Sequence, residues 1–263
     1  LRCGAQGQCT WWIDLWVIGR FAIHQPMQEI EDVGFCRHAC FQSHFHSAQN
    51  ILLIVLQNQG QDVDHLAITA RTLDEGVAWV RDMLGIEMPP GGSHPRMGTH
   101  NRLLALGPAD FLEVIAVDPD APAPDAGRWY GLDSFDDSPR IGTWILGTQD
   151  IAVSLAHAHP DSGPAVEAVR GDLEWLISVP QDGSMPMQGA YPTLIQWPAG
   201  PLPVTRMQDR GCSLQSLTVR HPDADTIAAR LNGQLHDPRV IFETGPVGLA
   251  ATFDTPSGKR TLG

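Results

Sequence analysis

The sequence is poor in basic residues, and Lys259 is its only lysine. Seventeen Lys and Arg residues stand against 30 Asp and Glu residues, which gives a formal net charge of −13. Such a chain has no general affinity for nucleic acid or for anionic membranes. The sequence also lacks a long apolar run, because the longest clear one, residues 51–56, is far shorter than the roughly 20 residues of a membrane-spanning helix. We therefore predict a cytoplasmic protein that has neither nucleic acid nor membrane as a partner.

Cysteine is scarce after residue 62, where Cys212 stands alone, so no disulfide framework is expected there. The first 62 residues hold the other four cysteines and show neither a sustained helical or strand period nor a convincing signal peptide. We predict that residues 1–62 are an N-terminal extension, disordered or non-native. Three alternatives stay open: a translated upstream stretch, a poorly ordered extension, or a small metal or redox module. The third rests on a Cys/His cluster whose spacing fits no common zinc finger, namely Cys36, His38, Cys40, His44 and His46.

Several catalytic signatures are also missing. The chain has no P-loop, no dinucleotide fingerprint in a strand–helix context and no nucleophile elbow. What it has is a strand–helix–strand pattern over residues 63–118. Alternation places His65 on one face of the first strand and Glu113 on one face of the last, each opposite an aliphatic face. Between the strands Thr72 can cap a helix that Gly85 can end, and the aliphatic faces would pack under this helix.

These residues carry a family resemblance. Asp-His-Leu-Ala-Ile at 64–68, Gly-Gly-Ser-His-Pro-Arg-Met-Gly-Thr-His-Asn at 91–101 and Phe-Leu-Glu-Val-Ile at 111–115 resemble the glyoxalase-like branch of the vicinal oxygen chelate superfamily. Later runs resemble the same branch, among them Pro-Thr-Leu-Ile-Gln-Trp at 192–197 and Ser-Leu-Thr-Val-Arg-His-Pro at 216–222. The resemblance covers roughly residues 63–263.

The resemblance implies an α+β fold in which repeated βαβββ units pair into a curved mixed sheet around a cavity. We predict a glyoxalase-like domain over residues 63–263. Its predicted parts are a first βαβββ unit at 63–118, a second unit at 141–198 and a C-terminal βαββ unit at 212–263. Strand–helix–strand repetition supports this organisation, and the cavity between paired units is the expected place for a small ligand. The chain holds enough units to close alone, so both a monomer and a homodimer are compatible with it.

The resemblance also implies a divalent metal ion (Zn, Mn, Ni or Fe(II)) that chelates vicinal oxygens of a small substrate. His65 and Glu113 match metal-ligand positions of the first unit. The second unit departs from the pattern, because Thr143 or Trp144 stands where a His is expected, and Gln196 or Ile195 where a Glu is expected. Sequence matching therefore assembles no complete metal site.

The remaining site predictions complete this picture. Besides Glu113, we predict His100 as a catalytic residue, which could be a third ligand, an acid/base or a donor to a substrate carboxylate. The predicted substrate-binding residues are His94, Arg96, Asn101, Trp144 and Gln196.

Two classes of function remain. The first is a metal-dependent enzyme acting on a small molecule with vicinal oxygens, with lyase or isomerase chemistry ahead of dioxygenase chemistry. The second is a metal-free protein of the same fold that binds or sequesters a small molecule. The missing ligands of the second unit and the tryptophans of the later strands favour the second class.

Overall fold

The computed structural model describes residues 2–3, 9–10 and 61–263. The chain divides into two compact parts, residues 1–49 and residues 50–263. In the part that covers residues 1–49, β1 (Arg2–Cys3) pairs antiparallel with β2 (Cys9–Thr10). The predictions for residues 1–62, including the zinc alternative, fall almost entirely outside the described residues. Within the described residues, no helix has both the length and the apolar character needed to span a membrane.

The first predicted βαβββ unit is present. Its elements are β3 (Val63–Thr69), α2 (Leu73–Leu84), β4 (Ser93–His94), β5 (Thr99–Ala105) and β6 (Phe111–Val117). Helix α2 begins where the sequence predicts, because the Thr72 hydroxyl accepts a hydrogen bond from the backbone N–H of Glu75. It ends at Gly85, which takes the left-handed conformation with φ 71°.

The second unit has the βαβββ order that the resemblance implies. Its elements are β7 (Arg140–Gly147), α3 (Ile151–Leu155), β8 (Ala165–Arg170), β9 (Leu173–Ser178) and β10 (Thr193–Gln196). The residue pattern of the sequence does not itself mark strand β8. Short 3-10 turns join the elements, at Trp129–Ser134, Pro160–Ser162, Pro186–Gly189 and Pro203–Arg206.

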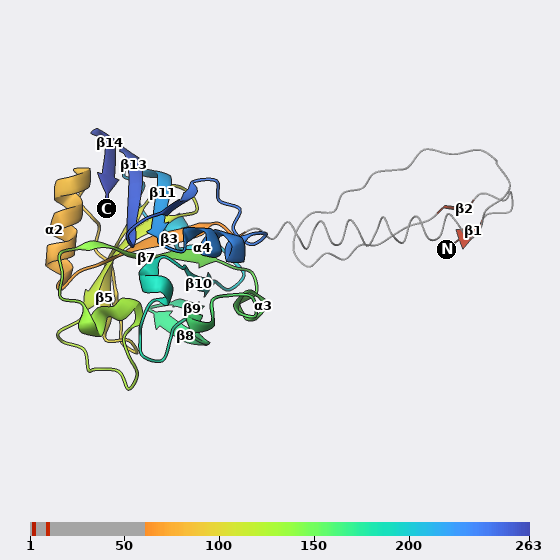
Figure 1. Cartoon of the computed structure of the whole chain (residues 1–263), viewed down its shortest axis with the longest axis horizontal. Helices are drawn as coiled ribbons and strands as arrows, with labels where there is room; N and C mark the ends of the chain where they lie inside the picture. The colour runs from red at the N-terminus through yellow and green to blue at the C-terminus, as the bar shows by residue number, and fades with distance from the viewer. Residues whose placement is uncertain (1, 4–8, 11–60) are drawn as a thin grey trace. The chain divides into compact units, whose positions relative to one another are not determined.

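The two units share one eight-stranded mixed sheet with the order β4-β5-β6-β3-β7-β10-β9-β8. Strand β3 joins them, since it pairs parallel with β6 and antiparallel with β7. Figure 1 labels β3 and β7 next to each other. The sheet curves so strongly that its edge strands β4 and β8 come close to each other. This curved, nearly closed sheet with few helices is the predicted α+β fold.

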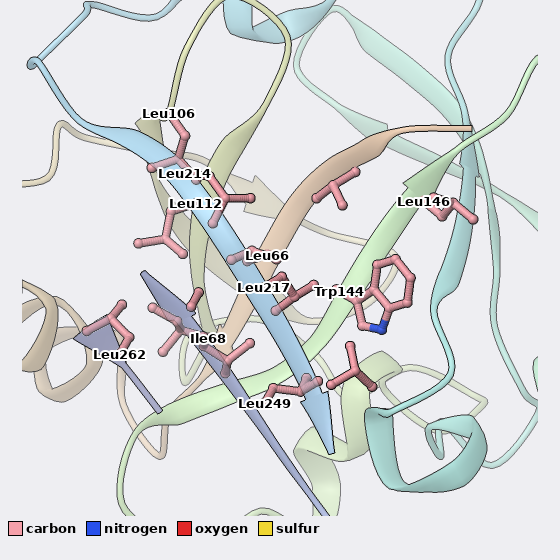
Figure 2. Close-up of a cluster of buried hydrophobic side chains, with 14 of the residues drawn as sticks. Leu66, Ile68, Leu106, Leu112, Trp144, Leu146, Leu214, Leu217, Leu249 and Leu262 are labelled. Carbon is pink, nitrogen blue, oxygen red and sulfur yellow. The ribbon is translucent and has the colours of Figure 1, made fainter. Parts of the chain in front are cut away.

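The C-terminal unit forms a sheet of its own. Its elements are β11 (Ser213–His221), α4 (Ala224–Leu231), β12 (Val240–Thr244), β13 (Gly248–Thr255) and β14 (Gly258–Leu262). The strand order is β12-β11-β13-β14, so β14 extends the predicted βαββ pattern by one strand. Strand β11, which carries Leu214 and Leu217, crosses over the strands of the large sheet (Figure 2).

The large sheet has two differently covered faces. On one face, Leu66, Leu112 and Val114 belong to a core that also includes residues of α2 and of the C-terminal sheet (Figure 2). On the other face, Ala67 and Ile115 belong to a second core that includes Trp129 and Tyr130. His65 and Glu113 therefore lie on the face turned away from α2, as the alternation predicts.

Candidate active site

A small cavity of about 30 Å³ lies on the second face, inside the curve of the large sheet. Residues from both units line it: His65, His94, Asn101, Phe111, Glu113, Trp129, Tyr130, Arg170, Trp175, Ile177, Ile195 and Trp197. Polar groups come mainly from the first unit, and most aromatic groups come from the second unit and from the segment between the two units. A few convergent polar groups in a concave, mostly aromatic setting are the usual mark of a small-molecule site.

His65 and Glu113 meet at this cavity because β3 and β6 run parallel, with Ala67 opposite Glu113. The His65 Nε2 atom lies 3.6 Å from the Glu113 Oε2 atom. Both residues are buried, and the His65 ring stacks on the Phe111 ring with centroids 4.4 Å apart. The imidazole plane is therefore fixed by stacking as well as by its polar partners.

Asp64 orients the imidazole from the other side. Its Oδ1 atom lies 2.6 Å from His65 Nδ1, and its Oδ2 atom accepts a hydrogen bond of 2.8 Å from the Trp197 indole. Burial opposes a charge on the imidazole, but hydrogen bonds and charges from Asp64 and Glu113 outweigh burial and raise the pKa of His65 to about 9. His65 is thus a protonated group between two carboxylates, with Nε2 turned toward Glu113.

Asn101 holds Glu113 in place. Its Nδ2 atom donates a hydrogen bond of 2.5 Å to Glu113 Oε1, and its Oδ1 atom accepts from the Gly92 N–H and from Arg170. Burial alone would raise the pKa of Glu113, but the contacts with His65 and Asn101 and the nearby His94 lower it to about 2. Both amide atoms of Asn101 are therefore committed to positioning.

His94 is the neutral histidine of the site. Its Nδ1 atom lies 3.1 Å from the Thr99 hydroxyl and its Nε2 atom 3.4 Å from Asn101 Nδ2. Burial lowers the pKa of His94 to about 4, so the ring carries no charge at neutral pH. Of the predicted substrate-binding residues, His94 and Asn101 are thus the two that the structure brings to the cavity.

The structure does not bring the other predicted residues there. His100 alternates with Asn101 on β5 and so belongs to the opposite face, and Arg96 is exposed in the turn between β4 and β5. Trp144 is fully buried on the α2 side, where its indole donates to the Ala190 carbonyl. Gln196 accepts a hydrogen bond from the Ile151 N–H at the start of α3. Strand alternation explains why His100, Trp144 and Gln196 lie away from the cavity, because neighbouring residues of a strand face opposite sides of the sheet.

Sequence reasoning gave no role to Asp64 or Arg170. Asp64 was visible only as the neighbour of His65, and strand alternation points the two side chains apart. Arg170 ends β8, the strand that the residue pattern does not mark, and it reaches the cavity because β8 approaches β4. The Trp129–Tyr130 pair lines the cavity and also packs in the second core.

Comparison with known protein families assigns the chain to one of them. The model of the glyoxalase-like domain family matches residues 63–235, more than half of the chain. The chain belongs to this family. The glyoxalase-like domain thus carries the vicinal oxygen chelate fold that the sequence predicts, while residues 236–263 lie beyond the matched region. No curated protein sequence matches the chain.

Solved structures resemble the glyoxalase-like domain at low sequence identity. A hypothetical protein from Staphylococcus aureus has 15% identity over 72% of this chain and 88% of its own, with a TM-score of 0.49. Streptomyces coelicolor methylmalonyl-CoA epimerase, solved with 2-nitronate-propionyl-CoA, has 18% identity over 54% of this chain and 100% of its own, with a TM-score of 0.39. The Mycobacterium tuberculosis methylmalonyl-CoA epimerase has 18% identity over 52% of this chain and 88% of its own, with a TM-score of 0.35.

The donor atoms at the site do not complete the predicted metal centre. His65 and Glu113 are good ligands, and Asp64 is placed as the partner that orients a metal-bound histidine. The second unit, however, offers Thr143 and Ile195 at the corresponding positions. No third His, Cys, Asp or Glu joins His65 and Glu113 in a metal-holding group anywhere in the described part of the chain. Catalytic zinc sites generally have three protein ligands, so His65 and Glu113 alone fall one ligand short of a resident zinc site.

Proposed function

We propose that the glyoxalase-like domain is an enzyme that moves a proton on a small molecule with neighbouring oxygens, using His65 and Glu113 without a resident metal. The observation that carries this proposal is the buried pair itself. A donor nitrogen and an acceptor oxygen lie 3.6 Å apart at the cavity, and Asp64 and Asn101 hold them from behind. Such preorganised pairs suit general acid–base chemistry.

The chemistry would be an enolisation. The Glu113 carboxylate takes a proton from the carbon beside the substrate carbonyl, and the electron pair of that C–H bond moves into an enolate. The Nε2–H of protonated His65 donates to the enolate oxygen and stabilises its charge. When Glu113 returns the proton to the same carbon, the result is hydrogen exchange alone. When it gives the proton to the former carbonyl carbon, His65 gives its Nε2 proton to the oxygen of that carbon and takes the proton of the neighbouring hydroxyl, whose carbon becomes the new carbonyl. The second route is an isomerisation, and both His65 and Glu113 end in their starting protonation states. A substrate between the two groups also removes the His65 contact that lowers the pKa of Glu113, so the carboxylate becomes a stronger base.

The test is solvent hydrogen exchange. The full chain is incubated in D₂O with dihydroxyacetone, glyceraldehyde or pyruvate, and proton NMR follows deuterium entering the carbon next to the carbonyl. We expect exchange with the parent protein and a loss of about 10²- to 10⁴-fold in Glu113→Gln and in His65→Gln. Matched controls are Glu174→Gln, which changes an exposed carboxylate on β9, and His100→Gln, which changes the histidine on the far face of β5.

These controls also test the residue assignment. Equal loss in His65→Gln and His100→Gln would contradict the assignment of His65 and revive the prediction that His100 is catalytic. Binding of these compounds without any exchange would instead favour the metal-free binding protein.

A metal-dependent enzyme is the second candidate. The 3.6 Å spacing of His65 Nε2 and Glu113 Oε2, with Asp64 behind the imidazole, favours it. Elemental analysis for Zn, Mn, Ni and Fe, together with exchange measured before and after chelation, separates the two candidates. We expect no stoichiometric metal and no effect of chelation. Near-stoichiometric metal that disappears in both His65→Ala and Glu113→Ala would replace our proposal by the metal-dependent one.

A further inference from the structure

We infer that Arg170, together with the indole N–H groups of Trp129 and Trp175, forms a subsite for the carboxylate of a small organic anion. The inference rests on the proposed function, since it takes the cavity as the place of reaction, and it adds the class of substrate. Three residues that line the same cavity and carry hydrogen-bond donors support it.

Arg170 is a cation without a carboxylate partner. It lines the cavity from β8, and its Nη1 atom donates a hydrogen bond of 3.2 Å to Asn101 Oδ1. Among the described residues, no Asp or Glu oxygen lies within 4.0 Å of its guanidinium, although several surface arginines of the same chain have such partners. A guanidinium keeps its charge in proteins and offers five donors, so one amide oxygen leaves most of them available.

The two indoles add donors that lack acceptors. Trp129 and Trp175 are 3% and 8% exposed, and the Nε1 atom of each is buried without a hydrogen-bond partner among the described residues. Both rings lie edge-on to the His94 ring, with centroids 5.1 Å and 6.0 Å from it. Buried polar groups are nearly always paired, so two orphan N–H groups beside one cavity indicate a ligand that brings acceptor oxygens.

A carboxylate matches these donors best. Its two oxygens accept from one guanidinium in a planar, bidentate arrangement and leave lone pairs for neighbouring N–H groups. A phosphate carries more charge and more oxygens than one guanidinium and two indoles can pair, and it would lie close to the Glu113 carboxylate. The cavity holds about 30 Å³, so even a small ligand must move side chains, and the partly exposed Arg170 and Trp197 are the wall residues freest to move.

The position of the subsite also orients the substrate. Asn101 lies between the two ends of the site, since it accepts from Arg170 and donates to Glu113. A carboxylate bound at Arg170 therefore directs the next carbon of the substrate toward Glu113 and His65. Small 2-hydroxy and 2-oxo acids have this arrangement, with a carboxylate one bond away from the oxygen-bearing carbon.

The experiment follows the indole N–H resonances of the full chain in ¹H–¹⁵N spectra during titration with glycolate, with its neutral analogue glycolamide and with inorganic phosphate. Trp129→Phe and Trp175→Phe assign the two resonances. We expect glycolate to shift both, and glycolamide to bind about 10- to 100-fold more weakly because it lacks the charge. Arg170→Gln should weaken glycolate binding by a similar factor. Arg102→Gln, a matched change on the far face of β5, should leave it unaltered.

Three results would overturn the inference: equal binding of glycolate and glycolamide, equal effects of Arg170→Gln and Arg102→Gln, or preference for phosphate over glycolate. Glu113→Gln keeps this test separate from the test of the proposed function. The variant should lose hydrogen exchange and still bind glycolate, because its amide leaves Arg170 and the indoles in place. Loss of exchange with binding retained therefore supports both proposals, whereas binding without exchange in the parent protein contradicts the proposed function alone.

Discussion

Replacing Arg239 with methionine should sharply destabilise the glyoxalase-like domain. Arg239 Nη1 donates to Asp110 Oδ2 at 2.6 Å, and Arg239 Nη2 donates to Asp237 Oδ2 at 2.7 Å. Asp110 and Asp237 are only 4% and 5% exposed. Asp237 also accepts from the backbone N–H of Val63, the first residue of the strand that carries His65. The arginine thus ties the start of β12 to the first unit.

The magnitude follows from what the substitution leaves behind. Arg239→Met keeps much of the side-chain volume but leaves two buried carboxylates without their cation. Breaking a buried ion pair in this way costs about 3–5 kcal/mol in the free energy of unfolding. For a chain of this size that lowers Tm by on the order of 10 °C. Arg220→Met is the matched control, because Arg220 pairs with Glu243 and both side chains are 48% exposed, so its cost should stay below about 1 kcal/mol.

The dependence on pH gives a second test. In the parent, Arg239 outweighs burial at Asp237 and lowers its pKa, whereas at Asp110 burial prevails and raises the pKa. Without Arg239 the folded-state pKa of both carboxyls rises. The two carboxyls then lower the free energy of unfolding at pH values above their unfolded-state pKa, and this loss of stability grows until the pH passes the folded-state pKa. Urea unfolding should therefore show a large deficit at pH 7 that shrinks as the pH falls toward the acid range. A deficit that is equal at pH 7 and pH 4.5, or no larger than that of Arg220→Met, would refute the reasoning.

Two further predictions concern packing and reactivity. Gly76→Ala should lower the free energy of unfolding by about 1–3 kcal/mol despite the better helix propensity of alanine, because the added Cβ would lie 2.5 Å from Val114 Cγ1. Gly248→Ala, which meets nothing within 4 Å, should be neutral or stabilising in the same urea titration. Cys212 should react with iodoacetamide at pH 8 about two orders of magnitude more slowly than a free thiol, because burial raises its pKa to about 11. Peptide mass spectrometry checks this, and rapid labelling of Cys212 in the folded protein would contradict the structure.

The site residues that could be predicted from the sequence belong to the first unit, as His65 and Glu113 do. In β3 and β6, His65 and Glu113 each alternate with aliphatic residues that need a core, so alternation indicates the face of each polar side chain. Strand β7 gives a weaker signal, because Thr143 is the only polar residue between Ile141 and Leu146 and large apolar residues lie on both of its faces. Alternation there says that Thr143 and Trp144 face opposite sides, but it does not say which side holds the cavity.

The part that could not be predicted depends on how the sheet closes. Arg170 lies on an edge strand whose residues are mostly exposed or partly exposed, so no apolar pattern marks β8. Its approach to Asn101 exists only because the curvature of eight strands brings β8 back to β4. The turn before β14 likewise carries no strong apolar signal, which is why the last strand of the C-terminal unit was missed.

The two units contribute different groups to the proposed site. The first unit supplies Glu113 and His65, whose pKa is raised by hydrogen bonds and charges from Asp64 and Glu113. The second unit supplies Trp175 and Arg170, and it has Ile195 at a position where the resemblance would place a metal ligand. A protonated imidazole can stabilise a developing enolate charge, the task that a metal ion performs as a Lewis acid. A second cation at Arg170 then serves the substrate rather than the reacting atoms. The proposal of a metal-free enzyme fits this arrangement, in which His65 and Glu113 carry out the chemistry and Arg170 with the tryptophans recognises the substrate.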